Sequence, residues 1–325
     1  MPYLTLEQLP PPPKDKRGWP WTEESPLLPD LMPDGNTWPK ISIITPTYNQ
    51  DEFFEETIRS VLLQGYPNLE YIIIDGESTD NTIEIIKKYS QFLPYWVSEP
   101  DNGQSHAVNK GIEKSTGQII GWINSDDVYY PGAFRRIIET MWVHGAPIHP
   151  IIYGGIDLID ERGHYLQRFP GKLVDKRKLI AYWRQEWHIP QPTVFFRSDI
   201  LKKHLLNESL HYAMDWELYL RLSYSYPFHH LPYTLVKFRS HSKSKTSGGW
   251  EPFNREQITI SKKYWSKNPN SYMFYCCDYY LWPLTKKGKL VLAFLRNILK
   301  LTLGHKYYEK IKVLKGTLLA RHSYK

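Results

Sequence analysis

The sequence predicts an α/β protein with a mostly parallel sheet, helices on both faces, and a C-terminal helical extension. From Lys40 onward, short apolar runs alternate with amphipathic segments through four strands, the pattern of a parallel sheet covered by helices. Those runs are apolar at nearly every position, which is typical of strands buried on both faces. Three of the strands end in polar residues, and ligands of open parallel sheets bind beyond the carboxyl ends of the strands.

The segment before the first strand, residues 1–39, is rich in Pro and Trp and has no periodicity. Two alternatives are open for it: an extended arm laid over the body by Trp19, Trp21 and Trp38, or a disordered leader. Residues 1–13 show no basic region followed by an apolar core, so we expect no secretory signal peptide.

The nucleotide-binding half of the body is expected at residues 40–130. We expect strands at 41–44, 71–74, 95–97 and 119–122, with a first helix at 51–64. Gly65-Tyr66-Pro67 ends that helix, and Asp80 or Ser78 can cap the next one.

The second half of the body, residues 131–250, is less regular. We expect a helix from 131 to 143, a strand at 151–153, a hairpin turn near 160–163, a strand at 192–197, a helix at 210–224 and a last strand at 234–238. We expect residues 251–325 to form a basic helical extension.

The central feature is a buried strand that runs directly into Asn124, Ser125, Asp126 and Asp127. Carboxylates at such a position are costly to desolvate unless a cation or strong donors face them, and Mg²⁺ or Mn²⁺ is the simplest occupant. The alternative is an Asp-Asp turn that only closes the strand. Because three strand ends meet at one rim, we favour a metal and nucleotide site. The chain has neither a G-x-G-x-x-G dinucleotide motif nor a P-loop.

The net charge of +7 is unevenly distributed. Residues 281–325 hold 11 Lys and Arg against one acid, whereas the rest of the chain holds 30 basic and 33 acidic residues. The body is therefore not expected to bind nucleic acid. The tail fits either an amphipathic helix on an anionic membrane surface, or a helix packed on the body or at a homodimer contact.

The cellular compartment is indicated by the two cysteines, which are adjacent, at Cys276 and Cys277. Adjacent cysteines rarely pair, which indicates a reducing compartment. The longest apolar-rich stretch falls short of a membrane span. We expect a cytoplasmic protein, with peripheral contact at the inner face of the membrane if the tail binds lipid.

Residues 40–246 resemble the family 2 glycosyltransferases of the GT-A fold, in their bacterial branch, whose sheet is Rossmann-like. Four signatures carry the resemblance: Thr45-Pro46-Thr47-Tyr48-Asn49, Asp75-Gly76-Glu77-Ser78-Thr79-Asp80, Asn124-Ser125-Asp126-Asp127, and Met214-Asp215-Trp216-Glu217 leading to Leu220-Arg221. Gln191-Pro192 and residues 239–245 also match. The resemblance implies a nucleotide-diphosphate sugar donor, a divalent cation (Mn²⁺ or Mg²⁺), and inversion at the anomeric carbon.

The same resemblance implies roles for individual residues. Asn124 stands where many members carry the first acid of an Asp-x-Asp motif. The implied nucleotide-sugar contacts are Thr45, Pro46, Tyr48, Asn49, Asp75 at the base or ribose, Glu77, Asn124, Ser125 and Asp126. The implied metal ligands are Asp126, Asp127 and His241, and the implied catalytic base is Asp215. We also place Lys110 at the diphosphate, and His188 and Gln191 on the acceptor side.

The residue types suit this chemistry. A cation stabilises the charge that develops on the leaving diphosphate, and a carboxylate must accept the proton of the acceptor hydroxyl. Asp215 and Glu217 lie two apart on a helix and cannot share a face. We favour Asp215 and expect Glu217 to be a solvated helix carboxylate. His241, Lys243 and Lys245 belong either to a loop that closes over phosphate or to a solvated basic loop.

The expected function is therefore sugar transfer to an acceptor hydroxyl, saccharide or lipid-linked, in polysaccharide or glycoconjugate assembly. Two alternative functions fit the sequence less well. A sugar-1-phosphate nucleotidyltransferase needs a Gly-rich, basic first loop, and residues 45–49 form neither. A non-catalytic nucleotide-binding scaffold would not need Asp126, Asp127 and Asp215 together.

Overall fold

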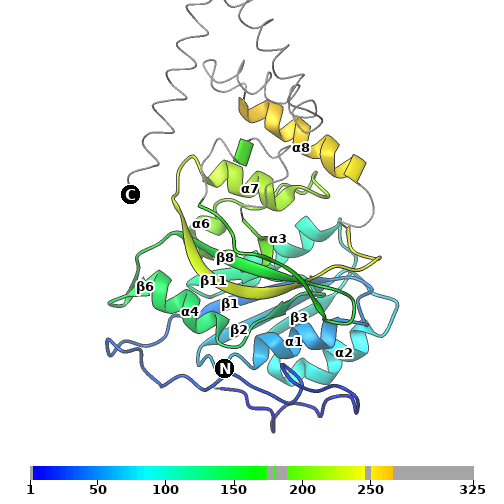
Figure 1. Ribbon diagram of the computed structural model, residues 1–325, viewed down its shortest axis with the longest axis vertical. Coiled ribbons are helices and arrows are strands. Elements are labelled where there is room, and N and C mark those ends of the chain that lie inside the picture. Colours follow the sequence, from blue (N-terminus) through cyan, green and yellow to red (C-terminus); the bar gives the residue numbers. More distant parts are fainter. Residues whose placement is uncertain (1–2, 174–178, 181–188, 246–249, 266–325) are drawn as a thin grey trace, which may run out of the picture. The chain divides into compact units, whose positions relative to one another are not determined.

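The structure is a computed structural model that describes residues 3–173, 179–180, 189–245 and 250–265 (Figure 1). The chain divides into two compact units, Met1–Ser261 and Lys262–Lys325. The first unit contains nearly all described residues, including the whole sheet. The predictions for His188, for the two cysteines and for the tail at 281–325 fall outside the described residues.

The first half of the sheet consists of parallel strands. β1 (Ile41–Thr47) pairs with β2 (Leu69–Asp75) on one side and β4 (Ile119–Trp122) on the other, and β2 pairs with β3 (Tyr95–Ser98). β1, β2 and β4 are buried along their whole length. The register sets Thr47 beside Asp75 and Asp75 beside Ser98. The polar ends of these strands therefore meet at one rim, as the sequence predicts.

The second half continues the same sheet, whose order is β3-β2-β1-β4-β10-β8-β11-β5. β10 (Phe195–Arg197) is antiparallel to both β4 and β8 (Ile151–Ile159). β8 is parallel to β11 (Phe228–Arg239), and β5 (Val128–Tyr129) is antiparallel to β11. β9 (Tyr165–Phe169) forms the expected hairpin with β8. The short pair β6 (Trp142–Val143) and β7 (Ala146–Pro147) stands apart.

Several boundary predictions for this half were wrong. The strand expected at 151–153 runs on to Ile159, the strand expected at 192–197 spans only Phe195–Arg197, and the helix expected to reach residue 143 ends at Met141. The last strand begins at Phe228, not at 234, because two register shifts and the polar His229 and His230 hide its alternation. The helix expected at 210–224 is α7 (Met214–Leu222), because the backbone amides of residues 211–213 bond to a distant side chain instead of continuing the helix.

Helices cover both faces of the sheet (Figure 1). α1 (Phe54–Leu62), α2 (Thr82–Tyr89) and α4 (Ala133–Met141) pack on one face, with the 3₁₀ turn η1 (Ser90–Phe92). α3 (Gln104–Lys114), α6 (Ser198–Leu201) and α7 pack on the other. The 3₁₀ turn η3 (Gln191–Thr193) precedes β10, and α8 is Trp250–Trp265.

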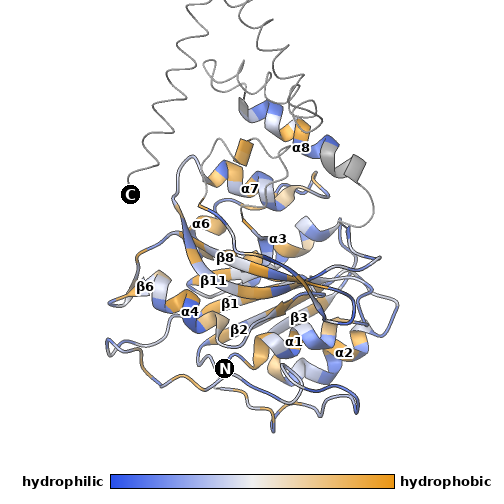
Figure 2. Ribbon diagram, in the orientation of Figure 1, coloured by the Kyte–Doolittle hydropathy of each residue, from blue (hydrophilic) through white to orange (hydrophobic). Residues whose placement is uncertain are grey.

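Alternate residues of each central strand enter opposite cores. Ile43 of β1 belongs to the cluster under α1, α2 and α4, while Ile44 belongs to the cluster under α3, α6 and α7. The central strands are accordingly coloured mostly hydrophobic in Figure 2. The mixed α/β sheet with helices on both faces confirms the predicted fold class.

Residues 3–39 lie along the body as an extended arm, the first of the two alternatives. Trp21 and Trp38 are buried, and the Trp19 Nε1 donates to the Tyr129 carbonyl at 2.7 Å. Arg59 of α1 is fully buried under this arm. Its guanidinium donates to the carbonyl oxygens of Pro10, Pro20 and Trp21 and to the Tyr89 hydroxyl.

Candidate active site

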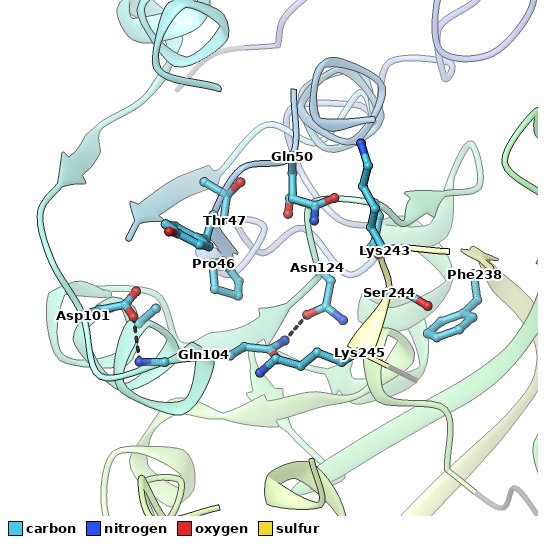
Figure 3. A pocket seen from close by; sticks show the side chains of 15 residues that line it. Pro46, Thr47, Gln50, Asp101, Gln104, Asn124, Phe238, Lys243, Ser244 and Lys245 are labelled. Carbon is cyan, nitrogen blue, oxygen red and sulfur yellow. Dashed lines mark hydrogen bonds between the residues drawn. The ribbon is translucent and has the colours of Figure 1, made fainter. Parts of the chain in front are cut away.

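A cavity of about 360 Å³ opens at the carboxyl ends of β1 and β4 (Figure 3). Its walls come from four places: the ends of β1 and β4, the loop between β3 and α3, and the segment after β11. The lining residues are Pro46, Thr47, Tyr48, Gln50, Asp101, Gly103, Gln104, Ala107, Asn124, Ser125, Asp126, Phe238, Lys243, Ser244 and Lys245. The site therefore lies where the strand topology predicts it.

The loop after β1 supplies one wall through Pro46, Thr47 and Tyr48. Tyr48 is 58% exposed, so its side chain is accessible to a ligand in the cavity. Asn49 adopts a left-handed φ of 52°, and its Oδ1 accepts the Thr79 amide at 2.8 Å while its own amide donates to the Ser78 Oγ. Asn49 thus ties the β1 loop to the β2 loop and does not line the cavity.

Asp75 is buried behind the cavity wall. Its carboxylate accepts hydrogen bonds from the Ser78 amide, the Ser78 hydroxyl and the Ser98 hydroxyl, the last at 2.6 Å. Glu77, two residues on, is exposed and has a φ of 66°. In the described structure Asp75 therefore orders the β2 loop, and neither carboxylate lines the cavity.

The residues after β4 form the cavity floor. Asn124 Oδ1 accepts the Gln104 Nε2 at 2.7 Å (Figure 3), and Ser125 is buried beside it. The Asp126 Oδ2 lies 2.8 Å from the His241 Nε2. The structure thus brings together Asp126 and His241, which lie 115 residues apart in the sequence.

Asp127 points the other way. It is fully buried, its Oδ1 accepts the backbone amide of Arg239 at 3.0 Å, and its Oδ2 has no hydrogen-bond partner among the described residues. Burial, followed by the charge of Asp126, raises the pKa of Asp127 well above its usual range. Arg239 is itself buried and donates to the carbonyls of Asp126 and Glu161 and to the Glu56 carboxylate. Asp127 and Arg239 together hold the floor in place.

The pair formed by Asp126 and His241 can hold a divalent cation. A carboxylate oxygen and an imidazole nitrogen already converge at 2.8 Å beside the cavity. Mg²⁺-type sites use one or two carboxylates and complete their shell with water and phosphate oxygens. The described residues contain no cluster of three or more His, Cys, Asp or Glu side chains arranged for a metal. A cation held by Asp126 and His241 would therefore need further ligands from the substrate.

Several lining residues were not among the sequence-derived candidates, notably Gln50, Asp101 and Gln104. The Asp101 Oδ1 accepts the Gly103 amide at 2.7 Å, and this turn starts α3 (Figure 3). The end of β3 obeys the same topology rule as the other strand ends, so that rule could have found Asp101 and Gln104. Lys243 and Lys245 also line the cavity; the Lys243 Nζ lies 3.5 Å from the Glu52 Oε2, and the Lys245 Nζ lies 3.3 Å from the His211 carbonyl.

Asp215 lies in the first turn of α7 and does not line the cavity. Its Oδ1 accepts the Trp216 amide at 2.7 Å, and burial raises the pKa of Asp215 to about 6 against the opposing charge of Lys245. Glu217 is not the solvated carboxylate that we expected. It is buried and paired with Arg221, whose Nη2 lies 3.1 Å from Glu217 Oε2, because the helix turns that position toward the body.

The remaining candidates lie outside the cavity lining. Thr45 is buried within β1, with its Oγ1 3.0 Å from the Tyr71 hydroxyl. The Lys110 Nζ is paired with Glu99 at 2.7 Å. The Gln191 Nε2 donates to the Trp122 carbonyl at 2.9 Å, at the end of β4. No described helix has the length and apolar character needed to cross a membrane.

Comparison with known families gives one match, to the family described as glycosyl transferase family 2, over residues 42–205. An uncharacterised glycosyltransferase of Rickettsia typhi is 33% identical over 65% of this chain and 68% of its own length. Another from Rickettsia conorii is 30% identical over 62% of this chain but only 34% of its own length. A Bacillus subtilis protein assigned by name to teichuronic acid biosynthesis, TuaG, is 31% identical over 41% of this chain and 53% of its own length.

Two solved structures share the fold. Staphylococcus aureus TarS in complex with UDP-GlcNAc superposes with a TM-score of 0.51 at 20% identity, covering 68% of this chain and 65% of that one. The mannosyltransferase PcManGT of Pyrobaculum calidifontis, in complex with GDP-Man and Mn²⁺, superposes with a TM-score of 0.52 at 16% identity, covering 90% and 88%. At these identities the likeness concerns the GT-A fold alone.

Proposed function

Because the chain belongs to glycosyl transferase family 2, we propose that it moves a sugar from a nucleotide-diphosphate donor to an acceptor hydroxyl with inversion at the anomeric carbon. The observation that carries the proposal is the cavity at the strand ends. There Asp126 lines the cavity together with Lys243 and Lys245, and the Asp126 Oδ2 lies 2.8 Å from the Nε2 of the buried His241. A carboxylate-held cation and two lysines suit the diphosphate of such a donor.

The donor would enter between the β1 loop and the β3–α3 loop. The exposed ring of Tyr48 offers a stacking surface for the base, and the Asp101 carboxylate and the Gln104 amide offer polar contacts for base or ribose. The nucleotide sugars bound to TarS and PcManGT support a donor of this class. Asp75 would act indirectly. By holding Ser78, it would keep the β2 loop, and the β1 loop attached to it, in shape.

Asp126 and His241 would hold the cation, Mn²⁺ or Mg²⁺, together with diphosphate oxygens. When bound, the cation supplies positive charge against the charge that develops on the leaving diphosphate. Lys243 and Lys245 would add point charges from the opposite wall, and the Asp127–Arg239 contact would keep Asp126 in place.

Asp215 would be the base that accepts the proton of the acceptor hydroxyl. A raised pKa suits this task, because a base whose pKa lies near the working pH is both deprotonated and able to take a proton. Attack from the side of the sugar opposite the diphosphate gives inversion. The acceptor would be a saccharide or lipid-linked, and the relative named for teichuronic acid biosynthesis supports a role in polysaccharide assembly.

The first test is a thermal-shift screen of UDP, GDP, CDP, ADP and TDP, each with and without Mn²⁺. Ligand at 100 times its Kd stabilises the native state by about 2.7 kcal/mol. We expect one nucleotide to raise Tm by several degrees only when Mn²⁺ is present, and the matching nucleotide sugar to be hydrolysed slowly by the same protein. No shift with any nucleotide would count against the donor site.

A pair of variants tests the cation site. Asp126→Asn should abolish the Mn²⁺-dependent part of the nucleotide shift, since Asp126 alone of the two faces the cavity. Asp127→Asn should keep that shift, because its Oδ1 contacts the Arg239 amide inside the protein. Isothermal titration of nucleotide with and without Mn²⁺ measures both. Loss of the Mn²⁺ effect only in Asp127→Asn would reverse the assignment.

A further inference from the structure

We propose that Glu256 of α8 is a positioning residue that fixes the backbone in front of Asp215, an inference that rests on the proposed function. The Glu256 Oε1 accepts the His211 amide at 2.8 Å, and its Oε2 accepts the amides of Tyr212 and Ala213 at 2.8 and 3.0 Å. One side chain therefore holds three successive backbone N–H groups, and Asp215 follows two residues after the last of them.

This arrangement is an anion-binding concavity filled from within the chain. Successive amides that point to one side attract a negative group, and hydrogen bonds to a carboxylate are stronger than neutral ones. Residues 211–213 form bends, and α7 starts only at Met214, after Ala213 at φ −110° and ψ 26°. The direction of the first turn of α7, which carries Asp215, is thus set by Glu256.

The position of Glu256 is itself supported by contacts of α8 with the body. Gln257 and Ile260 are buried, and the Ser261 Oγ donates to the Ile180 carbonyl at 3.0 Å. The neighbouring Leu179 carbonyl accepts the Trp216 Nε1 at 2.9 Å. Leu179 and Ile180 therefore contact α7 and α8 respectively, so the Glu256 carboxylate is presented from a packed helix.

The same backbone segment also reaches the donor cavity. The Lys245 Nζ lies 3.3 Å from the His211 carbonyl, and Lys245 lines the cavity wall. Its charge interacts with the carboxylates of Asp101, Glu256 and Asp215. Glu256 thus holds a segment that touches the donor wall at one end and carries the base at the other.

The test compares Glu256→Ala and Glu256→Gln with the control Thr259→Ala. Thr259 is an exposed residue on the same helix whose hydroxyl donates to the Arg255 carbonyl within α8. Each full-length variant is assayed for kcat and donor KM in the transfer or donor-hydrolysis reaction, for nucleotide affinity, and for hydrogen exchange of the amides at 211–213.

We expect Glu256→Ala to lower kcat on the order of 10- to 100-fold, since a displacement of about 1 Å can cost 10²-fold. Donor KM and nucleotide affinity should change by a smaller factor than kcat, because the held segment meets the donor wall through Lys245 whereas the Asp126 floor is untouched. Exchange at 211–213 should accelerate. Glu256→Gln, which keeps one acceptor oxygen, should lose less activity, and Thr259→Ala should match the parent protein.

Two results would overturn the proposal. Unchanged kcat per folded molecule, with only a lower Tm, would make Glu256 merely structural. Unchanged hydrogen exchange at residues 211–213 would show that Glu256 does not hold these backbone amides. Failure of the proposed function looks different: the parent protein itself would neither transfer nor hydrolyse any nucleotide sugar, and the catalytic role of Glu256 would then fall even if the exchange results hold.

Discussion

At the scale of single residues, four carboxylates of the site differ in what surrounds them. Asp75 accepts three hydrogen bonds from serines, Asp126 faces a histidine, Asp127 is buried against the Arg239 backbone, and Asp215 has a pKa raised to about 6. Chemically identical carboxyl groups can take different roles when their surroundings differ. In the proposed mechanism, direct roles at the substrate are therefore assigned to Asp126 and Asp215.

The pH dependence of Asp215 is a prediction at this scale. As a base it works deprotonated, so kcat should rise with pH through about 6 and then level off. Its carboxyl has a higher pKa in the folded than in the unfolded chain, so the folded state binds more protons between about pH 4 and 6. The contribution of this group to stability therefore falls as pH rises through that window.

Asp215→Asn separates these two effects. It should abolish transfer, leave nucleotide binding intact, and raise Tm at neutral pH, where a partly buried charge is removed. At about 1.4 kcal/mol for each tenfold change in proton affinity, the gain is at most about 3 kcal/mol. Activity assays and thermal unfolding from pH 4 to 8 measure both. Full activity in Asp215→Asn would show that another group is the base.

At the scale of elements, the arm and α1 depend on one another. Arg59 is fully buried, and its guanidinium is satisfied by three arm carbonyls and the Tyr89 hydroxyl, with the Trp21 ring 5.6 Å away. Buried charges persist only when such donors are satisfied. The arm therefore packs over the buried Arg59 of α1, on the face of the sheet opposite α3 and α7.

Arg59→Ala should lower the free energy of unfolding by about 3 kcal/mol, because it leaves several buried carbonyls without donors. Arg135→Ala is the control, since Arg135 forms an exposed pair with Glu139 on α4 and such pairs contribute at most about 1 kcal/mol. Urea unfolding followed by fluorescence of the tryptophans measures both. Equal losses in the two variants would contradict the role of the arm.

At the scale of the whole body, β10 joins the two halves of the sheet. It lies between β4, which carries the acidic floor, and β8, and it is antiparallel to both. Gly121 of β4 pairs with Phe195 of β10, and a Cβ added at Gly121 would lie 2.8 Å from the Phe195 ring. The absence of a side chain at 121 lets the ring pack over the junction.

Gly121→Ala should therefore lower the free energy of unfolding by about 1–3 kcal/mol, the usual cost of overpacking a core. The double variant Gly121→Ala, Phe195→Leu should be more stable than the sum of the single changes implies, because the smaller side chain relieves the clash. A double-mutant cycle by denaturant unfolding measures the coupling. Strict additivity would show that the two residues do not compete for space.

Much of the fold and the location of the site could be predicted from the sequence. Apolar runs at 41–44, 71–74 and 119–122 report burial on both faces, and the topology of parallel strands brings their polar ends to one rim whatever the side chains do there. These features depend on neighbours in sequence, so local patterns contain them. Membership of the glycosyltransferase family followed from motifs at those same strand ends.

The tertiary structure alone decided which side chains face the cavity and which support it. Asp126 and Asp127 are adjacent and chemically alike, yet Asp126 meets His241 while Asp127 meets the Arg239 backbone. Glu217 became buried, and Glu256 was paired with amides far away in the chain. A local pattern records the burial of a residue but not the identity of a partner distant in sequence, because that partner is set by how the packed elements meet.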